Sequence, residues 1–216
     1  MKTKPDGNVA FKVTWVYNAH QGDFNAPCDP PGRTINIARE RKVWCSHELD
    51  PLVEDDEPCA CKILYNEGNT APYLPRRFGG YQSPCYDAEI FSKWRFNSGY
   101  YHHGDHAGEP IPLKYYRPNK WAFLTSKRFD MPEEDRRIIG CYRVTAEEWD
   151  SEMEDWFLVG GNPKECYRCC DPNRAPRYWD FHSQKGGPRW GTGLFRYIPD
   201  DEAHAMLNAV KFSAAL

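Results

Sequence analysis

Cys166, Cys169 and Cys170 form the pattern in this sequence that is closest to a metal site. Two residues separate Cys166 from Cys169, which is the spacing of many zinc-binding thiolates. Cys59 and Cys61 could supply further ligands, although the chain has no second pair of cysteines at the same spacing. Two interpretations stay open here: a structural zinc ion, or free and partly buried thiols.

A second cluster of metal-ligand types contains His102, His103, Asp105 and His106. Imidazole and carboxylate groups bind transition metals, so a metal here, or at the cysteine-rich segment, could serve a small hydrolase or nuclease. The surrounding segment is polar and glycine-rich, so the alternative is an exposed polar turn. His182 is a further candidate partner for the cysteines.

Motifs for other kinds of catalysis are missing from the sequence. There is no nucleophile elbow, Walker loop, nuclease core or dinucleotide fingerprint. The Gly191-Thr-Gly193 segment lies within a strand-like pattern, and neither a lysine nor a helix start follows it. We therefore predict a binding module that is not an enzyme by itself, with no catalytic residues and no cofactor except the zinc ion considered above.

Composition narrows the class of protein further. The chain has 216 residues, a net charge of −3 and 15% aromatic residues. A negative total charge excludes a protein that grips nucleic acid through an overall basic field, so any such contact needs a local patch. No apolar run is long enough for a membrane span, and we expect a soluble, cytoplasmic protein without a membrane partner. The nine cysteines fit reduced thiols better than a disulfide framework.

The elements that must position these residues are short. Strands are predicted where β-branched and aromatic residues gather, at residues 9–17, 34–46, 59–65, 121–125, 137–144, 156–159 (at a sheet edge) and 190–198. Short helices are predicted at residues 87–94, 145–149 and 199–210, from apolar spacing and from acidic residues at the helix starts. Strands separated by irregular connections favour an α+β fold, with a twisted or barrel-like sheet and a few short flanking helices.

Three segments in this order resemble the EVE family of the PUA-like superfamily: VWCSHELDP (43–51), GGYQSPCYDAEIFSKW (79–94), and WAFLTSKRF with DRRIIGCYRV (121–144). The resemblance implies one EVE/PUA-like domain over residues 1–216. It further implies an N-terminal extension (1–32), insertions near residues 97–114 and 160–188, and a barrel closed by residues 190–198 and the helix after them.

The same resemblance implies a concave pocket that takes in one modified base. Stacking on aromatic rings is worth ~1–3 kcal/mol per base, and polar groups read the base edge. The pocket residues implied are Trp44, Ser46, Tyr81, Gln82, Ser83, Cys85, Tyr86, Thr125 and Ser126. Gln82 is well suited because its amide both donates and accepts hydrogen bonds. The alternative is that Tyr81 and Tyr86 fill the core and Gln82 caps the following helix.

Four basic residues in predicted loops beside this pocket, Arg76, Arg77, Lys127 and Arg128, could position phosphates. The alternative is that they are solvated charges balanced by nearby carboxylates. The resemblance implies a reader of modified DNA, in preference to RNA, within a modification-dependent restriction system whose nuclease or NTPase part lies on another domain or subunit. Besides the metal-dependent enzyme, a zinc-stabilised protein-interaction domain is the remaining hypothesis.

Overall fold

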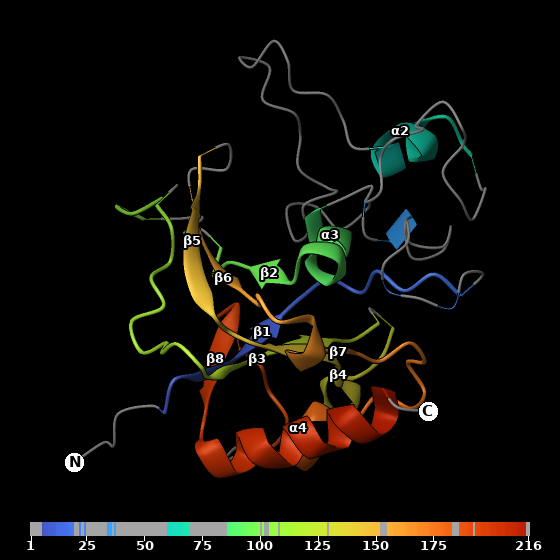
Figure 1. The fold of residues 1–216 in the computed structure, drawn as a ribbon. Helices are drawn as coiled ribbons and strands as arrows, with labels where there is room; N and C mark the ends of the chain where they lie inside the picture. The colour runs from blue at the N-terminus through green and yellow to red at the C-terminus, as the bar shows by residue number, and fades with distance from the viewer. Residues whose placement is uncertain are drawn as a thin grey trace. The chain divides into compact units, whose positions relative to one another are not determined.

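The structure is a computed structural model, and it describes residues 6–19, 22, 24, 34–35, 37, 60–69, 86–99, 101, 104–107, 109–128, 130–151, 155–182, 186–191 and 193–214. The chain divides into two compact units (Figure 1). The larger unit combines Met1–Val13 with Lys93–Leu216, and the smaller unit is Thr14–Ser92. Each unit is described here by itself.

A five-stranded mixed sheet organises the larger unit. Its strands are β1 (Asn8–Lys12), β3 (Trp121–Ser126), β4 (Arg137–Arg143), β7 (Cys166–Arg168) and β8 (Phe195–Ile198). They lie in the order β7-β4-β3-β1-β8. The β1–β3 pair is parallel and the other pairs are antiparallel. The predicted strands at residues 121–125 and 137–144 are confirmed, and the one at 9–17 is confirmed in its first half.

Helix α4 (Asp200–Ala214) covers one face of this sheet, at the bottom of Figure 1. Its buried residues Ala203, Met206, Leu207 and Val210 follow the three- and four-residue spacing of one helix face. They pack against sheet residues such as Phe123 in the core of the unit. The helix predicted at residues 199–210 is therefore confirmed and continues for one further turn.

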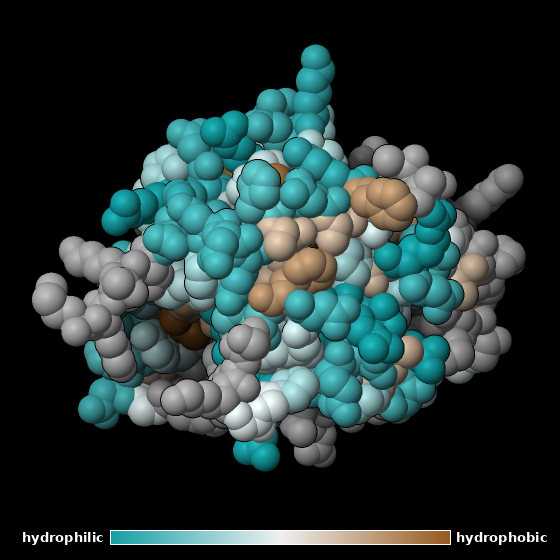
Figure 2. All heavy atoms as spheres, turned by 90° about the horizontal axis from the view of Figure 1, so that it is seen from below, coloured by the Kyte–Doolittle hydropathy of each residue, from teal (hydrophilic) through white to brown (hydrophobic). Residues whose placement is uncertain are grey.

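Polar residues such as Asp201, His204 and Asn208 are exposed on α4. Seen from below, the molecular surface is mostly hydrophilic, with apolar patches between (Figure 2). Phe212 is a large apolar residue of this helix that is exposed, with 72% of its surface accessible. Asp200, Asp201 and Glu202 occupy the first turn of the helix, where negative charge favours the helix dipole. Within the described residues, no helix is long and apolar enough to cross a membrane.

A second, three-stranded antiparallel sheet in the larger unit has the order β2-β6-β5. Its strands are β2 (Arg95–Phe96), β6 (Asp155–Val159) and β5 (Ala146–Asp150). The helix predicted at residues 145–149 is wrong, because every residue of β5 pairs with one of β6. The strand predicted at 156–159 is confirmed, but it lies in the centre of its sheet, and its predicted edge position is wrong.

Three short 3-10 helices connect these elements: η3 (Glu133–Asp135), η4 (Pro163–Glu165) and η5 (Tyr178–Asp180). The last brings Tyr178 into the core beneath the sheet. Regular strand structure begins only at Phe195, because the backbone before it turns through Gly191, which has a positive φ of 82°.

The smaller unit contains α2 (Ala60–Asn66) and all of α3 (Tyr86–Lys93) except its last residue, which lies across the unit boundary. The strand predicted at residues 59–65 is wrong. Cys61 and Leu64 are both fully buried and lie three residues apart, a spacing that places them on one face of a helix. Of the strand predicted at 34–46, the described residues 34, 35 and 37 are helical. The helix predicted at 87–94 is confirmed.

The α+β class is confirmed, but the closed barrel is wrong for the described part of the chain. Strands β7 and β8 lie at opposite edges of the sheet, and β8 pairs with β1. Strand β1 also lies inside the sheet, between β3 and β8, although the sequence resemblance begins only at Val43. The described sheet is thus open, and the N-terminal segment is part of its centre.

Candidate functional site

Most of the predicted base pocket lies outside the described residues. This holds for Trp44, Ser46, Tyr81, Gln82, Ser83 and Cys85. Tyr86 begins helix α3, but its side chain is also outside the described set. The pocket on the loop before α3 therefore stays a prediction, as do the phosphate contacts of Arg76 and Arg77, which lie outside as well.

Thr125 and Ser126 end strand β3 and are fully buried. The Thr125 hydroxyl donates a hydrogen bond to the Phe11 carbonyl oxygen at 2.8 Å, and the Ser126 hydroxyl donates to the Val13 carbonyl oxygen at 2.9 Å. The Val13 amide donates in return to the Thr125 carbonyl oxygen. Both hydroxyls are thus committed to holding the N-terminal segment against β3, and neither faces solvent.

Lys127 and Arg128 follow β3 in a connecting loop, and both contact neighbouring groups of that loop. Lys127 Nζ donates to the Met131 carbonyl oxygen at 2.6 Å. Arg128 donates to both carboxylate oxygens of Asp130, at 2.8 and 2.6 Å. These hydrogen bonds from Arg128 are the main reason that the pKa of Asp130 lies below its usual value. Because the pair is exposed, Arg128 could exchange Asp130 for a phosphate at little cost.

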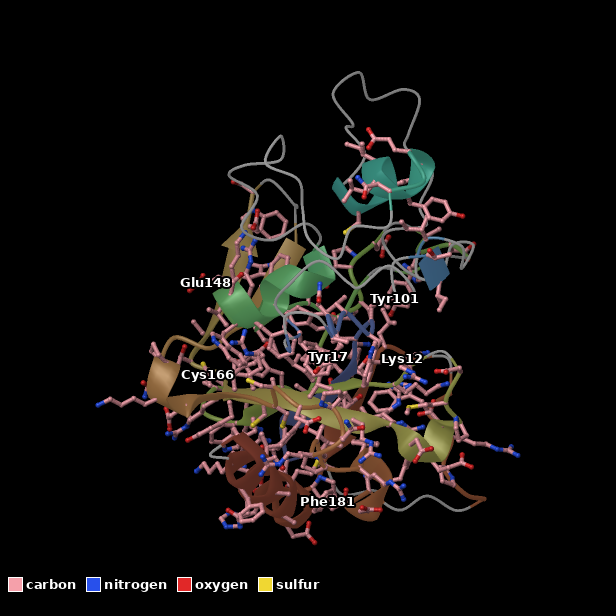
Figure 3. The ribbon with its side chains drawn as sticks, turned by 90° about the vertical axis from the view of Figure 1, so that its right-hand side faces the viewer. Lys12, Tyr17, Tyr101, Glu148, Cys166 and Phe181 are labelled. Carbon is pink, nitrogen blue, oxygen red and sulfur yellow. The ribbon has the colours of Figure 1, made fainter. Side chains whose placement is uncertain are left out.

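The cysteine-rich segment contributes free thiols, and the structure separates them. Cys169 is buried in the core, Cys166 is half-buried at the start of β7 (Figure 3), and Cys170 is exposed. Burial raises the pKa of Cys166 to about 11 and that of Cys169 to about 12. Zinc binds the thiolate form, which these raised pKa values disfavour.

The described residues hold no group of three His, Cys, Asp or Glu side chains placed to bind a metal ion. His182 contacts Glu202 on α4 at 2.6 Å, and the closest described contact of Cys166 is the Asn162 carbonyl oxygen. His106 pairs with Glu109 on the surface. His102 and His103 lie outside the described residues, and so does Cys59.

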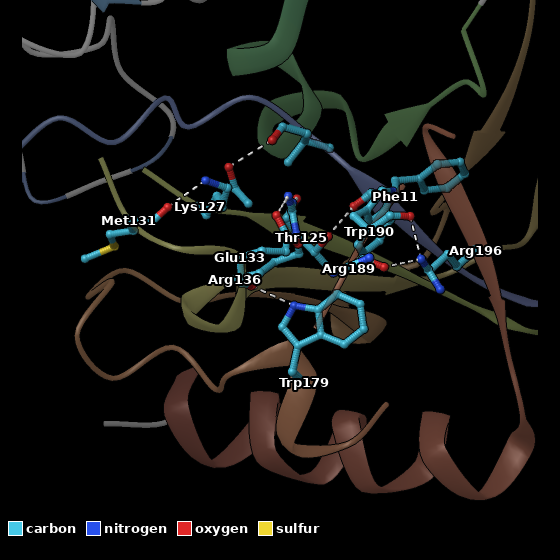
Figure 4. Close-up of polar contacts among 12 residues, drawn as sticks. Phe11, Thr125, Lys127, Met131, Glu133, Arg136, Trp179, Arg189, Trp190 and Arg196 are labelled. Atoms are coloured by element: carbon cyan, nitrogen blue, oxygen red, sulfur yellow. Dashed lines mark hydrogen bonds and ion pairs between the residues drawn. The ribbon is translucent and has the colours of Figure 1, made fainter. Parts of the chain in front are cut away.

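Sequence reasoning missed a stack of guanidinium and indole groups beneath the sheet (Figure 4). The Arg136 guanidinium lies over the Trp190 ring at 4.7 Å, although only 1% of Arg136 is exposed. The Arg196 guanidinium lies 5.4 Å from the Trp190 ring and 5.6 Å from the Trp179 ring. The Trp179 indole donates to the Glu133 carbonyl oxygen. The alternating cations and rings stabilise one another through cation–π contacts.

This stack also contains buried polar atoms without hydrogen bonds from the described residues, namely the Tyr178 hydroxyl and Arg196 Nε. Burial raises the pKa of Tyr178 well above its usual value. Arg136 and Trp190 are exposed by only 1% and 5%, so we assign the stack a role in stability. A run of Trp, Tyr and Arg between residues 177 and 196 was the sequence signal that could have found it.

An open cavity of about 220 Å³ lies beside Trp121, between the starts of β1 and β3 and the first turns of α4. It is lined by Asn8, Asn119, Lys120, Trp121, Asp200, Ala203, His204 and Leu207. An indole ring, two amides, an ammonium and an imidazole thus surround a space smaller than the roughly 300–1,000 Å³ of drug-sized ligand sites.

Part of the polar lining is already paired within the cavity. Asn8 donates to the Asp200 carboxylate at 2.7 Å and accepts from the Trp121 amide at 3.0 Å. Lys120 Nζ binds both carboxylate oxygens of Asp200, at 2.7 and 2.8 Å. The cavity can therefore offer a ligand mainly the side chain of Trp121 and the exposed side chains of Asn119 and His204.

Comparison with known proteins finds no relative of this chain. No family model matches the chain, and neither the curated proteins nor the solved structures contain a match. Function must therefore be argued from the residues themselves.

Proposed function

We propose that this chain is a nucleic-acid-binding module that recognises a modified base in DNA. It would hold one flipped base in an aromatic pocket on the loop that precedes α3, with Tyr81 and Tyr86 as stacking rings and Gln82 reading the base edge. Its biological setting would be the specificity part of a modification-dependent restriction system, with the cutting or NTP-driven part on another domain or subunit.

The observation that supports this proposal is that elements which the resemblance requires occur in the expected chain order. Helix α3 begins at Tyr86, directly after the segment predicted to hold the pocket. Strands β3 and β4 are adjacent and antiparallel, and β8 followed by α4 belongs to the same sheet and core. An open sheet with loops at its strand ends is a scaffold on which a base pocket can be built.

Charge limits how such a module would bind. With a net charge of −3, the chain cannot rely on the phosphate backbone for most of its affinity. Affinity must then come from the base itself, and each stacked base contributes ~1–3 kcal/mol. We expect weak binding to plain duplexes and a shallow dependence on salt.

The test is a binding panel with the full chain. Fluorescence anisotropy would compare otherwise identical duplexes that carry plain, methylated or hydroxymethylated bases, together with the matching RNA. One modified duplex should bind at least about tenfold more tightly than the plain one, which corresponds to about 1.4 kcal/mol. Equal affinity for all duplexes would contradict the proposal.

Variants then locate the pocket. Tyr81→Ala should weaken binding of the modified duplex by about tenfold, in line with the loss of one stacking ring. His204→Ala changes an exposed residue at the cavity beside Trp121 and serves as the matched control. If His204→Ala abolished binding while Tyr81→Ala had no effect, the base pocket would be at that cavity and the assignment to the loop would be wrong.

A further inference from the structure

Two tryptophans lie side by side on the surface of the three-stranded sheet. Trp149 of β5 and Trp156 of β6 are directly opposite each other in the strand register. Their ring centroids are 5.5 Å apart, with an angle of 60° between the planes. Half of each residue is exposed, 50% for Trp149 and 51% for Trp156. We call the two strands β5 and β6 the tryptophan hairpin.

The hairpin does not need these rings to fill its own core. Phe157 and Leu158, which follow Trp156 in β6, are exposed by only 0% and 1%. The Tyr142 hydroxyl also donates to the Leu158 carbonyl oxygen at 2.8 Å, which joins the hairpin to the rest of the unit. Large aromatic residues that stay half exposed beside such a core are typical of a contact surface for another molecule.

The charge of the hairpin indicates which kind of molecule this is. The sequences of these two strands include four carboxylates and no lysine or arginine; the four are Glu147, Glu148, Asp150 and Asp155. Glu147 and Glu148 are exposed, and Figure 3 shows Glu148 on β5. Asp150 is paired with Arg95 at 2.6 Å. The two strands thus carry a formal charge of −4, whereas the whole chain carries −3.

Glu147 shares one face of β5 with Trp149, whereas Glu148 pairs with Phe157 and lies on the other face. Two consequences follow from carboxylates on the same strands as exposed indole rings. Phosphate-bearing partners such as nucleic acids and anionic lipids are repelled by the carboxylates. The guanidinium and ammonium groups of a partner are attracted both by the carboxylates and by the faces of the indole rings. The rings are too close to each other to admit a cation between them, so a cation would lie on their outer faces.

Backbone geometry favours an extended partner. Among the described strands, β5 is at the edge of its sheet and pairs only with β6. An extended segment can add to such an edge through main-chain hydrogen bonds, while its alternate side chains reach one face of the sheet. On that face they would meet Trp149 and then Trp156.

We propose that the tryptophan hairpin is a docking surface for a protein segment that is basic and extended, with arginine or lysine alternating with apolar residues. Arginine side chains of the partner stack on Trp149 and Trp156, and the carboxylates of the two strands supply the charge complement. This surface uses other residues than the proposed base pocket, and the inference does not depend on nucleic-acid binding.

The experiment uses the full chain and a fluorescein-labelled ten-residue peptide in which arginine alternates with valine. The matched control peptide has glutamate in place of arginine. Anisotropy should show at least about tenfold tighter binding of the basic peptide, and added salt should weaken it. Equal binding of the two peptides would overturn the proposal.

Variants of the chain test the two parts of the surface separately. Trp149→Thr together with Trp156→Thr keeps strand-forming residues and should weaken binding of the basic peptide by about tenfold. Phe212→Ala removes an exposed ring on α4 and should leave that binding unchanged. Unchanged binding in the double tryptophan variant, with an unchanged circular dichroism spectrum, would show that the rings are not the docking site.

A charge reversal keeps the test valid even if the double tryptophan variant does not fold. Glu147→Lys together with Glu148→Lys leaves both rings in place and should remove the preference of the chain for the basic peptide, because it brings the formal charge of the two strands from −4 to 0. If the preference did not change, or if vesicles of neutral phosphatidylcholine displaced the basic peptide, the hairpin would be an apolar or lipid-binding surface and the proposal would fail. Binding of modified DNA should be the same in all these variants.

Discussion

At the scale of single residues, burial changes what a charged side chain does. Arg136 and Arg128 both bind a carboxylate through two hydrogen bonds, to Glu133 and to Asp130. Arg136 is 1% exposed, also donates to the Thr125 carbonyl oxygen, and lies over Trp190. Arg128 is exposed. A buried ion pair that loses one partner leaves an uncompensated charge, whereas an exposed pair is replaced by water.

This contrast gives a paired prediction. Arg136→Met should lower the free energy of unfolding by about 2–4 kcal/mol, because Glu133 loses its cation and Trp190 loses its guanidinium. Arg128→Met, the matched control, should change it little. Urea unfolding followed by circular dichroism would measure both. Equal effects of the two substitutions would contradict the structural role that we assign to Arg136.

Asp200 provides a prediction on pH. Hydrogen bonds from Lys120 and then from Asn8 lower its pKa below the usual 3.8. A lowered pKa in the folded state means that the ionised carboxylate stabilises the fold at pH values above the unfolded pKa. That contribution is lost as the pH falls through the folded pKa.

Asp200→Asn should therefore be less stable than the natural chain at pH 7, and the difference should shrink as the pH is lowered below about 3.8. The side chain is 59% exposed, so solvent screening keeps the effect small. Thermal unfolding of both proteins between pH 3 and pH 7 would measure it. A difference that grows toward low pH would contradict this assignment.

At the scale of elements, α4 shows how one helix face carries the packing. Met206 and Val210 are fully buried against the sheet, while Phe212 on the same helix is 72% exposed. An apolar residue of this helix therefore contributes to the free energy of packing only if its side chain points toward the sheet. Ala203 and Leu207 of this helix are buried as well. His204 of the same helix is exposed and lines the cavity beside Trp121.

Substitutions on α4 test this directly. Met206→Ala should lower the free energy of unfolding by about 2–4 kcal/mol, since it removes a buried side chain and leaves a cavity. Phe212→Ala removes a larger ring but should change stability by less than about 0.5 kcal/mol, because that ring is exposed. Chemical unfolding of the two variants gives the comparison. A larger loss from Phe212→Ala would show that this ring is covered in solution.

At the scale of the whole molecule, the larger unit is built from two distant parts of the chain. Strand β1 pairs with both β3 and β8, so Met1–Val13 supplies a central strand to a sheet whose other strands come after Lys93. The Phe11 and Phe96 rings lie 4.8 Å apart within this unit. The smaller unit, Thr14–Ser92, is thus inserted between two segments that are neighbours in the fold.

We therefore expect the larger unit to fold without the insertion. A chain in which residues 14–92 are replaced by a twelve-residue glycine-serine linker, which reaches roughly 40 Å when extended, should keep a cooperative unfolding transition and its β-sheet spectrum. Deletion of residues 1–13 should abolish folding, because it removes a strand with two neighbours. Circular dichroism and thermal melts would distinguish these outcomes. A linker chain that does not fold would show that the smaller unit is required.

The sequence by itself determined the elements whose signal is local. Clusters of β-branched and aromatic residues identified β3 and β4, helical spacing identified α3, and proline and acidic residues at the helix start identified α4. The sequence also determined the α+β class. Local pattern was insufficient for β5, whose sequence AEEWD is compatible with a helix and becomes a strand because β6 lies beside it.

Tertiary structure alone decided where the remaining residues act. It buried Thr125, Ser126 and Arg136, paired Arg128 with Asp130, and left the ring of Trp149 half exposed. It also brought β1 into the centre of the sheet and left that sheet open. The physical reason is that burial, partner choice and strand order depend on contacts between residues far apart in the chain, whereas propensity and periodicity depend only on neighbours.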